Sequence, residues 1–263
     1  MGQPLPAWCV VIPFFNHAGS IGTVLEGVKT LGLRCYLVDD GSDADSESVL
    51  AALADREGAW LRLLQYRPNQ GKGMAVVTGL RAAAADGYTH AVQIDADGQH
   101  DSADARRLLE LSQRDPSAMI TGFAVFDASV PRSRLYGRYV THVWVWINTL
   151  SLQIRDTMCG LRVYPLADTL AAWRGAGRFW LLGMGKRMSF DTEILVRLYW
   201  RGVRIVNVPV PVTYPLDGVS HFRLWRDNLQ LSGAHARMFV GMLWRSPLLL
   251  LRLARRHLAG AAA

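Results

Sequence analysis

The first half of the chain alternates short apolar runs with amphipathic segments. Strand-like patterns lie at residues 8–15, 34–42, 60–66 and 89–97. Helical periodicity occupies the intervening stretches, at residues 16–30, 46–56, 74–85 and 103–114. Because strands and helices alternate, the pattern predicts an α/β fold with a mostly parallel sheet and helices on both of its faces.

The second half has a different spacing of apolar positions, which predicts more helix than in the first half. A tryptophan-rich helix is expected at 135–152, a further helix at 189–202, a strand at 203–212, and helices from about 227 onward, with Pro247 starting the last one. The chain is therefore divided into an α/β half at 1–130, a second half of the same domain at 131–226, and a helical tail at 227–263.

Positive charge is concentrated near the C-terminus. Residues 1–196 hold 19 Lys or Arg and 20 Asp or Glu, whereas residues 197–263 hold 10 Arg and 2 Asp. A basic tail favours an anionic partner, either a membrane surface or a nucleic acid. No nucleic-acid-binding motif accompanies the charge, so no nucleic-acid partner is expected.

The tail RSPLLLLRLARRHLAG predicts a basic amphipathic helix. Its arginines lie opposite its leucines: Arg252, Arg255 and Arg256 against Leu249, Leu250 and Leu253. Such a helix can lie on a membrane surface, or pack on the domain with its arginines in water. The same two alternatives, core or interface, apply to Trp144 and Trp146. No uncharged apolar run reaches the roughly 18 residues of a membrane-spanning helix.

The three cysteines do not form a metal-binding or disulfide pattern. Their number is odd, and Cys9 and Cys35 fall inside strand patterns, where cysteine is usually a small buried apolar residue. A reducing, cytosolic compartment is expected.

The stretch IDADGQHD at residues 94–101 places three aspartates at the end of a predicted strand. In extended chain, Asp95, Asp97 and Gln99 would point the same way. Two carboxylates and an amide oxygen form a hard-oxygen cluster suited to Mg²⁺ or Mn²⁺. The alternative is an acidic turn held by local hydrogen bonds from the backbone.

Two other polar stretches accompany it. The adjacent acids Asp39 and Asp40 end the second strand, and glycines surround Lys72 just before a helix. A helix start with free backbone N–H groups and a lysine suits a diphosphate. The spacing is not that of a P-loop, and no GxGxxG motif follows the first strand.

These four stretches, VVIPFFNH, VDDGSDADS, NQGKGMAVVTGL and DADGQHD, together resemble the family 2 glycosyltransferases of the GT-A fold. The resemblance covers about the first 130 residues. DADGQH followed by CGLR is similar to the branch that makes dolichyl- and polyprenyl-phosphate sugars.

The resemblance implies that residues 1–130 form the donor-binding half and residues 131–226 the acceptor-binding half of the same domain. It implies a donor site, in which Asp39 and Asp40 contact the base or ribose, and a metal site. The implied donor-binding residues are Pro13, Phe15, Asn16, Asp39, Asp40, Gly71, Lys72, Asp95, Ala96 and Asp97. The implied ligands of Mg²⁺ or Mn²⁺ are Asp95, Asp97 and Gln99.

The resemblance also implies an acceptor side. Asp191, in SFDTE, is the candidate catalytic base; the alternative is that Ser189 caps the helix and the acids merely favour its first turn. Asp156 and Arg162, in RDTMCGLRVY, and His221 and Arg223, in DGVSHFR, are implied to bind the acceptor or a phosphate. The alternatives are a glycine turn with a surface arginine, and a solvated basic loop. Cys159 is not expected to be a nucleophile.

The expected activity is metal-dependent transfer of a sugar, with inversion, from a nucleoside-diphosphate sugar to a lipid acceptor such as polyprenyl phosphate. One alternative is transfer to a hydroxyl of a glycan or another acceptor. An alternative of another class is a catalytically silent, membrane-associated binding protein. The protein is expected at the inner face of the membrane, held peripherally by its C-terminal basic helix.

Overall fold

A single seven-stranded sheet organises the molecule. The computed structural model describes residues 5–126, 132–176, 184–212 and 224–261. The strands are β1 (Trp8–Phe14), β2 (Cys35–Asp39), β3 (Leu61–Gln65), β4 (His90–Gln93), β5 (Met119–Phe126), β6 (Arg162–Pro165) and β7 (Ile205–Val212). Their spatial order is β3-β2-β1-β4-β6-β5-β7.

All neighbouring strands are parallel except those that flank β6. That strand runs antiparallel to both β4 and β5, so β4 and β5 point the same way. The predicted mostly parallel sheet is confirmed, and the carboxyl ends of β1, β2, β4 and β5 share one edge. Ligands of open α/β sheets bind at that edge.

Helices cover both faces, because the strands are apolar on both sides. In β1, Cys9 and Val11 join one core cluster while Val10 and Ile12 join the other. On the first face lie α3 (Lys72–Ala85), α6 (Leu166–Ala176) and α7 (Phe190–Arg201); on the second lie α1 (Ala18–Lys29), α2 (Ala44–Glu57) and α4 (Ser102–Arg114). A short 3₁₀ turn, Gly58–Trp60, leads into β3. Cys9 and Cys35 are buried apolar residues, as predicted.

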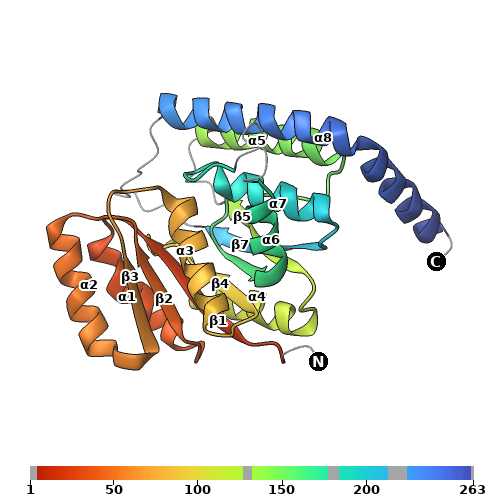
Figure 1. The fold of residues 1–263 in the computed structure, drawn as a ribbon. Coiled ribbons are helices and arrows are strands. Elements are labelled where there is room, and N and C mark those ends of the chain that lie inside the picture. The colour runs from red at the N-terminus through yellow and green to blue at the C-terminus, as the bar shows by residue number, and fades with distance from the viewer. Residues whose placement is uncertain (1–4, 127–131, 177–183, 213–223, 262–263) are drawn as a thin grey trace.

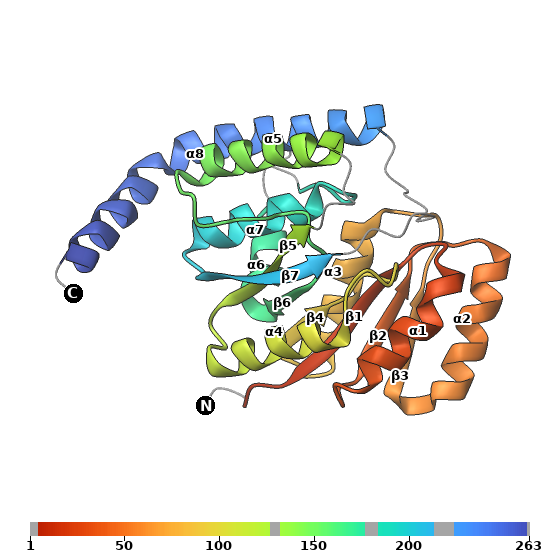
Figure 2. The same ribbon diagram turned by 180° about the vertical axis from the view of Figure 1, so that it is seen from behind.

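Two further helices form an outer layer. Helices α5 (Arg132–Thr149) and α8 (Leu224–Ala261) lie side by side over α7, and the two opposite views agree on this (Figures 1 and 2). Among the described helices, none combines the length and hydropathy that a membrane span requires.

Pro247 does not start a new helix, contrary to the prediction, but lies within α8, which changes direction along its course (Figure 1). Proline lacks the N–H that would bond the carbonyl four residues earlier, here that of Leu243. The Ser246 hydroxyl donates to this carbonyl at 2.9 Å instead. The helix therefore continues through the proline with that acceptor satisfied.

Candidate active site

A chain of alternating charges crosses the carboxyl edge of the sheet. Lys72, the first residue of α3, places its Nζ 2.7 Å from Asp95 Oδ2 and 3.0 Å from Asp191 Oδ2. Arg162 Nη1 lies 3.4 Å from Asp191 Oδ1. The tertiary fold thus joins four predicted site residues from four separate segments: after β4, at the start of α3, in β6 and in α7.

Asp95 and Asp97 are not presented by a strand as predicted, because β4 ends at Gln93. Asp97 Oδ1 accepts a hydrogen bond of 3.1 Å from the Gln99 backbone N–H, which is the local acidic turn that the sequence left open. The turn still leaves the two carboxylates close enough to interact. Burial, and then the charge of Asp95, raise the pKa of Asp97.

The surroundings of Asp95 act in the opposite direction. Burial raises the pKa of Asp95, but the Lys72 ammonium outweighs it, and the net effect is a lowered pKa. One lysine therefore balances one carboxylate and leaves the second in a negative environment. That surplus of negative charge fits a divalent cation with hard-oxygen preference.

Among the described residues, no group of three or more His, Cys, Asp or Glu side chains could hold a metal alone. A cation on Asp95 and Asp97 would take its other oxygens from Gln99, from water or from a bound phosphate. The acids fit Mg²⁺ or Mn²⁺ as one side of a shell that the substrate completes.

Gly160, in the CGLR motif, makes room for Asp95. A Cβ at this position would overlap the Asp95 carboxylate. The glycine therefore shapes the candidate site, a role that was not predicted for it from the sequence. The motif alone held no sign of which side chain would lie against it.

Arg162 does not face the acceptor side as predicted; it is fully buried. Its guanidinium donates to the carbonyls of Thr157 at 2.6 Å, Cys159 at 2.9 Å and Asp191 at 2.8 Å. A cation that is buried needs such a complete set of acceptors. Arg162 therefore ties the 157–159 loop to the start of α7 and cannot grip a phosphate in this structure.

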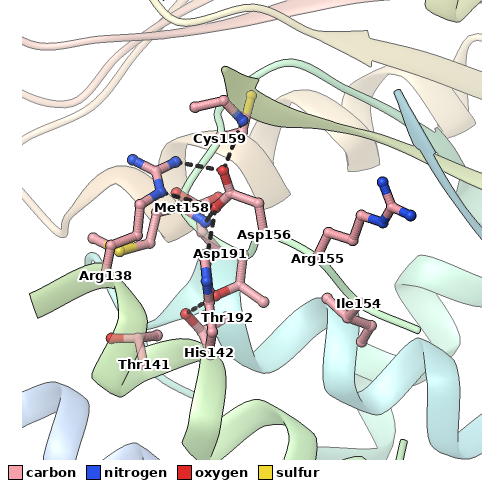
Figure 3. Close-up of polar contacts among 12 residues, drawn as sticks. Arg138, Thr141, His142, Ile154, Arg155, Asp156, Met158, Cys159, Asp191 and Thr192 are labelled. Atoms are coloured by element: carbon pink, nitrogen blue, oxygen red, sulfur yellow. Dashed lines mark hydrogen bonds and ion pairs between the residues drawn. The ribbon is translucent and has the colours of Figure 1, made fainter. Parts of the chain in front are cut away.

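Asp156 has a similar structural role. Figure 3 shows Arg138 and His142, both from α5, directed toward its carboxylate. Arg138 Nη2 donates at 2.6 Å, the backbone N–H groups of Ala124 and Met158 donate at 3.0 and 2.8 Å, and His142 Nε2 lies 3.6 Å away. Burial alone would raise the pKa of Asp156, but these partners lower it overall. Asp156 thus joins the loop to α5 and β5 rather than facing an acceptor.

Cys159, beside these residues, is inert as expected. Burial, with a smaller contribution from Asp156, raises the pKa of its thiol to about 12. A thiol that stays protonated at neutral pH is not a nucleophile.

The start of α3 is covered, which differs from the expected open diphosphate cradle. The Met74 N–H donates to the Lys186 carbonyl at 3.0 Å, and Arg187 Nη1 donates to Asn69 Oδ1 at 3.1 Å. A Cβ at Gly71 would overlap Arg187, and one at Gly73 would overlap Phe190. The segment before α7, which includes Lys186 and Arg187, therefore packs directly on the glycine-rich loop around Lys72. No local sequence pattern predicts this contact.

Asp39 and Asp40 are both buried and engaged. Asp40 accepts from the backbone N–H groups of Gln70 and Gly71, both at 2.8 Å, and from Asn69 Nδ2 at 2.9 Å. Burial raises the pKa of Asp40, and these hydrogen bonds oppose that effect. The carboxylate thus links the end of β2 to the Lys72 loop.

Asp39 Oδ1 accepts from the Ser42 N–H and hydroxyl at 3.0 and 2.5 Å, and Asp39 Oδ2 accepts from Gln65 Nε2 at 3.3 Å. The proposed contact of Asp39 and Asp40 with a base or ribose stays a prediction.

The remaining donor-side residues shape the same edge. Asn16 has a positive φ of 54° and accepts from the Asp43 N–H at 2.9 Å, so it joins the ends of β1 and β2. Phe15 is half-buried beside it, whereas Pro13 and Ala96 are buried. His221 and Arg223 lie outside the described residues, and their predicted role is unchanged.

The two acids at the start of α7 take part in tertiary contacts rather than simple capping. Ser189 makes no side-chain cap, so the alternative in which its side chain caps the helix is not seen. Asp191 contacts Lys72 and Arg162, as described above. Glu193 is fully buried, accepts from the Gly185 N–H at 2.9 Å, and pairs with Arg237 of α8 at 3.0 Å and Arg197 at 3.5 Å.

Comparison with known proteins agrees with this architecture. The model of the family described as "Glycosyl transferase family 2" matches residues 9–168. The chain is 25% identical to a dolichyl-phosphate beta-glucosyltransferase of Dictyostelium discoideum, over 80% of this chain and 67% of that protein. It is 27% identical to an undecaprenyl-phosphate mannosyltransferase of Micrococcus luteus, over 76% of this chain and 81% of that protein.

Among solved structures, glucosyl-3-phosphoglycerate synthase of Mycobacterium tuberculosis in complex with Mn²⁺ and UDP-glucose is similar in fold. The TM-score is 0.61 at 17% identity, covering 91% of this chain and 78% of that one. The likeness confirms the expected GT-A fold.

Proposed function

Because this chain belongs to glycosyl transferase family 2 and is a glycosyltransferase, we propose that it moves a sugar from a nucleoside-diphosphate sugar to a lipid acceptor, a polyprenyl phosphate or a similar molecule. The observation that carries the proposal is the bridge made by Lys72. It brings the acids after β4 and the acid of α7 within reach of one ammonium group. Donor and acceptor would meet at such a junction.

On the donor side, the chain must stabilise a diphosphate that gains negative charge as its bond to the sugar breaks. Asp95 and Asp97, with Gln99 beside them, would hold Mg²⁺ or Mn²⁺, which supplies Lewis-acid stabilisation of the leaving diphosphate. Lys72 adds a second positive charge at the same place, and Gly160 leaves Asp95 the space it occupies. Asn16, Asp39 and Asp40 would shape the nucleotide pocket.

On the acceptor side, Asp191, which pairs with Lys72 at 3.0 Å, would orient the attacking oxygen. For a hydroxyl acceptor it would take the proton as a general base. A phosphate acceptor is already ionised and needs no strong base, and Lys72 next to Asp191 supplies positive charge that attracts it. Attack from the face opposite the leaving diphosphate inverts the anomeric carbon.

The names of the relatives support a lipid phosphate as the acceptor, since they act on dolichyl and undecaprenyl phosphates. We propose that the protein works peripherally on the inner face of the membrane, where such acceptors are embedded, with the basic C-terminal helix contributing to the association.

The test measures binding and transfer with one variant and one control. Isothermal titration of UDP and GDP in the presence of Mn²⁺ should show binding that Asp97→Asn weakens by roughly 100-fold, since a metal contact is worth several kcal/mol. Asp55→Asn, which changes an exposed acid of α2, should bind as the original protein does. Transfer from UDP- or GDP-sugars to polyprenyl phosphate is then measured. Unchanged nucleotide binding by Asp97→Asn would contradict the donor site, and transfer only to glycan hydroxyls would contradict the acceptor.

A further inference from the structure

The outer helices α5 and α8 expose apolar side chains at helical spacing. Among the described residues, the exposed large apolar side chains of α5 are Tyr136, Tyr139, Val140, Trp144 and Ile147; those of α8 are Leu229, Phe239, Val240, Leu243, Trp244, Leu248, Leu250 and Leu251. Trp244 is 88% exposed and Tyr136 is 71% exposed. Steps of three, four and seven residues place each set along one side of its helix.

The two sets form one continuous surface, named here the α5–α8 face. Trp144 of α5 meets Phe239 of α8 edge-on, with ring centroids 6.3 Å apart. Both helices run side by side along the outside of the molecule (Figures 1 and 2). The opposite sides of both helices are already used: Val145 of α5 and Met238 and Met242 of α8 are buried.

Charge identifies what would cover this face. The sequences of α5 and α8 contain nine arginines and a single acid, Asp227. Two copies of such a layer would bring two regions of net positive charge together, which disfavours self-association. Tyrosine, tryptophan and leucine together with arginine, and nearly no acids, are typical of a helix surface that lies in the headgroup region of an anionic bilayer.

The contacts of α8 around Pro247 show which of its side chains are already covered. Leu249 is buried, and Arg252 Nη1 donates to the Trp200 carbonyl at 2.8 Å. Arg245 lies over the Trp200 ring at 4.8 Å. These residues fasten α8 to α7, and among the described residues the exposed apolar side chains of α5 and α8 named above remain available to a lipid surface.

We propose that the α5–α8 face is a docking surface for an anionic lipid bilayer, with Trp244, Leu248 and Tyr139 entering the headgroup region and the net positive charge of the layer attracting lipid phosphates. The inference rests on the proposed function, because it names the surface from which a lipid acceptor would be presented. The inference assigns the membrane contact to a surface made by two helices, α5 and α8, instead of to the C-terminal tail alone.

The test is flotation with two kinds of vesicle, phosphatidylcholine alone and phosphatidylcholine mixed with phosphatidylglycerol. The full chain should float with the mixed vesicles and much less with the neutral ones. The double variant Trp244→Glu with Leu248→Glu should bind the mixed vesicles at least about tenfold more weakly, because charged residues are costly in the apolar region. Thermal unfolding checks that the variant is folded, since both positions are exposed.

The matched control is Leu5→Glu, which alters a residue that is also 88% exposed but belongs to the segment leading into β1 and not to the α5–α8 face. This control should float as the original chain does. Equal flotation by the double variant, or an equal loss with Leu5→Glu, would overturn the inference.

A second measurement separates this inference from the proposed function. Transfer to a short-chain, water-soluble prenyl phosphate without vesicles should be the same for the double variant and the original chain. Loss of that transfer by the double variant alone would overturn the inference, because the face would then belong to the reaction site. If neither protein transfers sugar, the proposed function fails while flotation still decides the docking surface.

Discussion

At the carboxyl edge of the sheet, four charged side chains from separate segments pair with opposite charges, whereas the α5–α8 layer contains many cations and almost no anions of its own. Asp95, Lys72, Asp191 and Arg162 alternate in sign and balance one another, and only Asp97 remains in negative surroundings. In the outer layer, Arg138 and Arg237 pair with acids that other segments supply, Asp156 and Glu193.

The difference points to different partners. A site that is balanced except for one carboxylate is suited to a small cation and its diphosphate. A layer with surplus arginine and exposed aromatic residues is suited to an extended anionic surface. Glu193 joins the two regions, because it contacts both Arg237 of α8 and the Gly185 N–H, next to the segment that covers the Lys72 loop.

The largest effect is expected for Glu193→Ala. The change removes a fully buried carboxylate from beside Arg237 and Arg197. Breaking a buried ion pair by removing one partner costs about 3–5 kcal/mol. Urea unfolding measures the loss. The control Glu47→Ala breaks an ion pair with Arg67 at the surface and should cost less than about 1 kcal/mol. Equal costs would show that Glu193 does not join the layers energetically.

His235, between α8 and α5, should make the outer layer sensitive to acid. Its ring stacks on Trp144 and faces Asn148, and burial lowers its pKa to about 4. The unfolded chain therefore binds the proton first as the pH falls, so stability is full above pH 6.5 and declines between pH 6.5 and about 4. The complete loss is about 3 kcal/mol, from 1.36 kcal/mol per pKa unit.

The measurement compares the free energy of unfolding at pH 7 and pH 4.5 for the original chain and for His235→Phe. Other groups titrate in both proteins, so the difference between them isolates His235. A variant that loses as much stability as the original chain would exclude this histidine as the cause.

Gly160→Ala tests the crowding of the donor site. The added methyl group must displace the Asp95 carboxylate. A misplacement of about 1 Å near reacting groups can cost about 100-fold in rate. Sugar transfer is measured alongside Gly175→Ala, a glycine in α6 with open space around it, which should keep full activity. Full activity in Gly160→Ala would mean that the Asp95 position is not critical.

Lys72→Met tests the charge balance between Lys72 and Asp95, and its expected effect, on Mn²⁺ binding, is the smallest of the four. Because Lys72 competes with a cation for Asp95, its removal should tighten the binding of Mn²⁺ alone by roughly fivefold, the equivalent of a partly exposed ion pair. Lys29→Met, which breaks a pair with Glu57 on the surface, is the control and should bind Mn²⁺ unchanged. Weaker Mn²⁺ binding in Lys72→Met would show that the lysine supports the cation instead of opposing it.

Local patterns in the sequence determined the elements of the donor half. The strand and helix positions there agree with the structure to within a few residues, because apolar spacing and glycine turns act over short distances. They also placed Asp95, Lys72 and Asp191 as candidates. The predicted end of the fourth strand was wrong, since an Asx turn at Asp97 competes with extended chain.

Only the tertiary structure decided which of these residues meet and which are buried. Nothing local to RDTMCGLRVY shows that Arg162 loses all contact with water, or that Gly160 lies against Asp95. Arg187 and Glu193 gain their partners from segments that are distant in the chain. Such contacts depend on how whole layers pack. Packing is determined by the summed free energy of burying many side chains, and not by any one motif. The sequence by itself therefore determined the elements and the chemistry available at the sheet edge, and the packing of layers assigned each side chain to the site, the core or the exposed α5–α8 face.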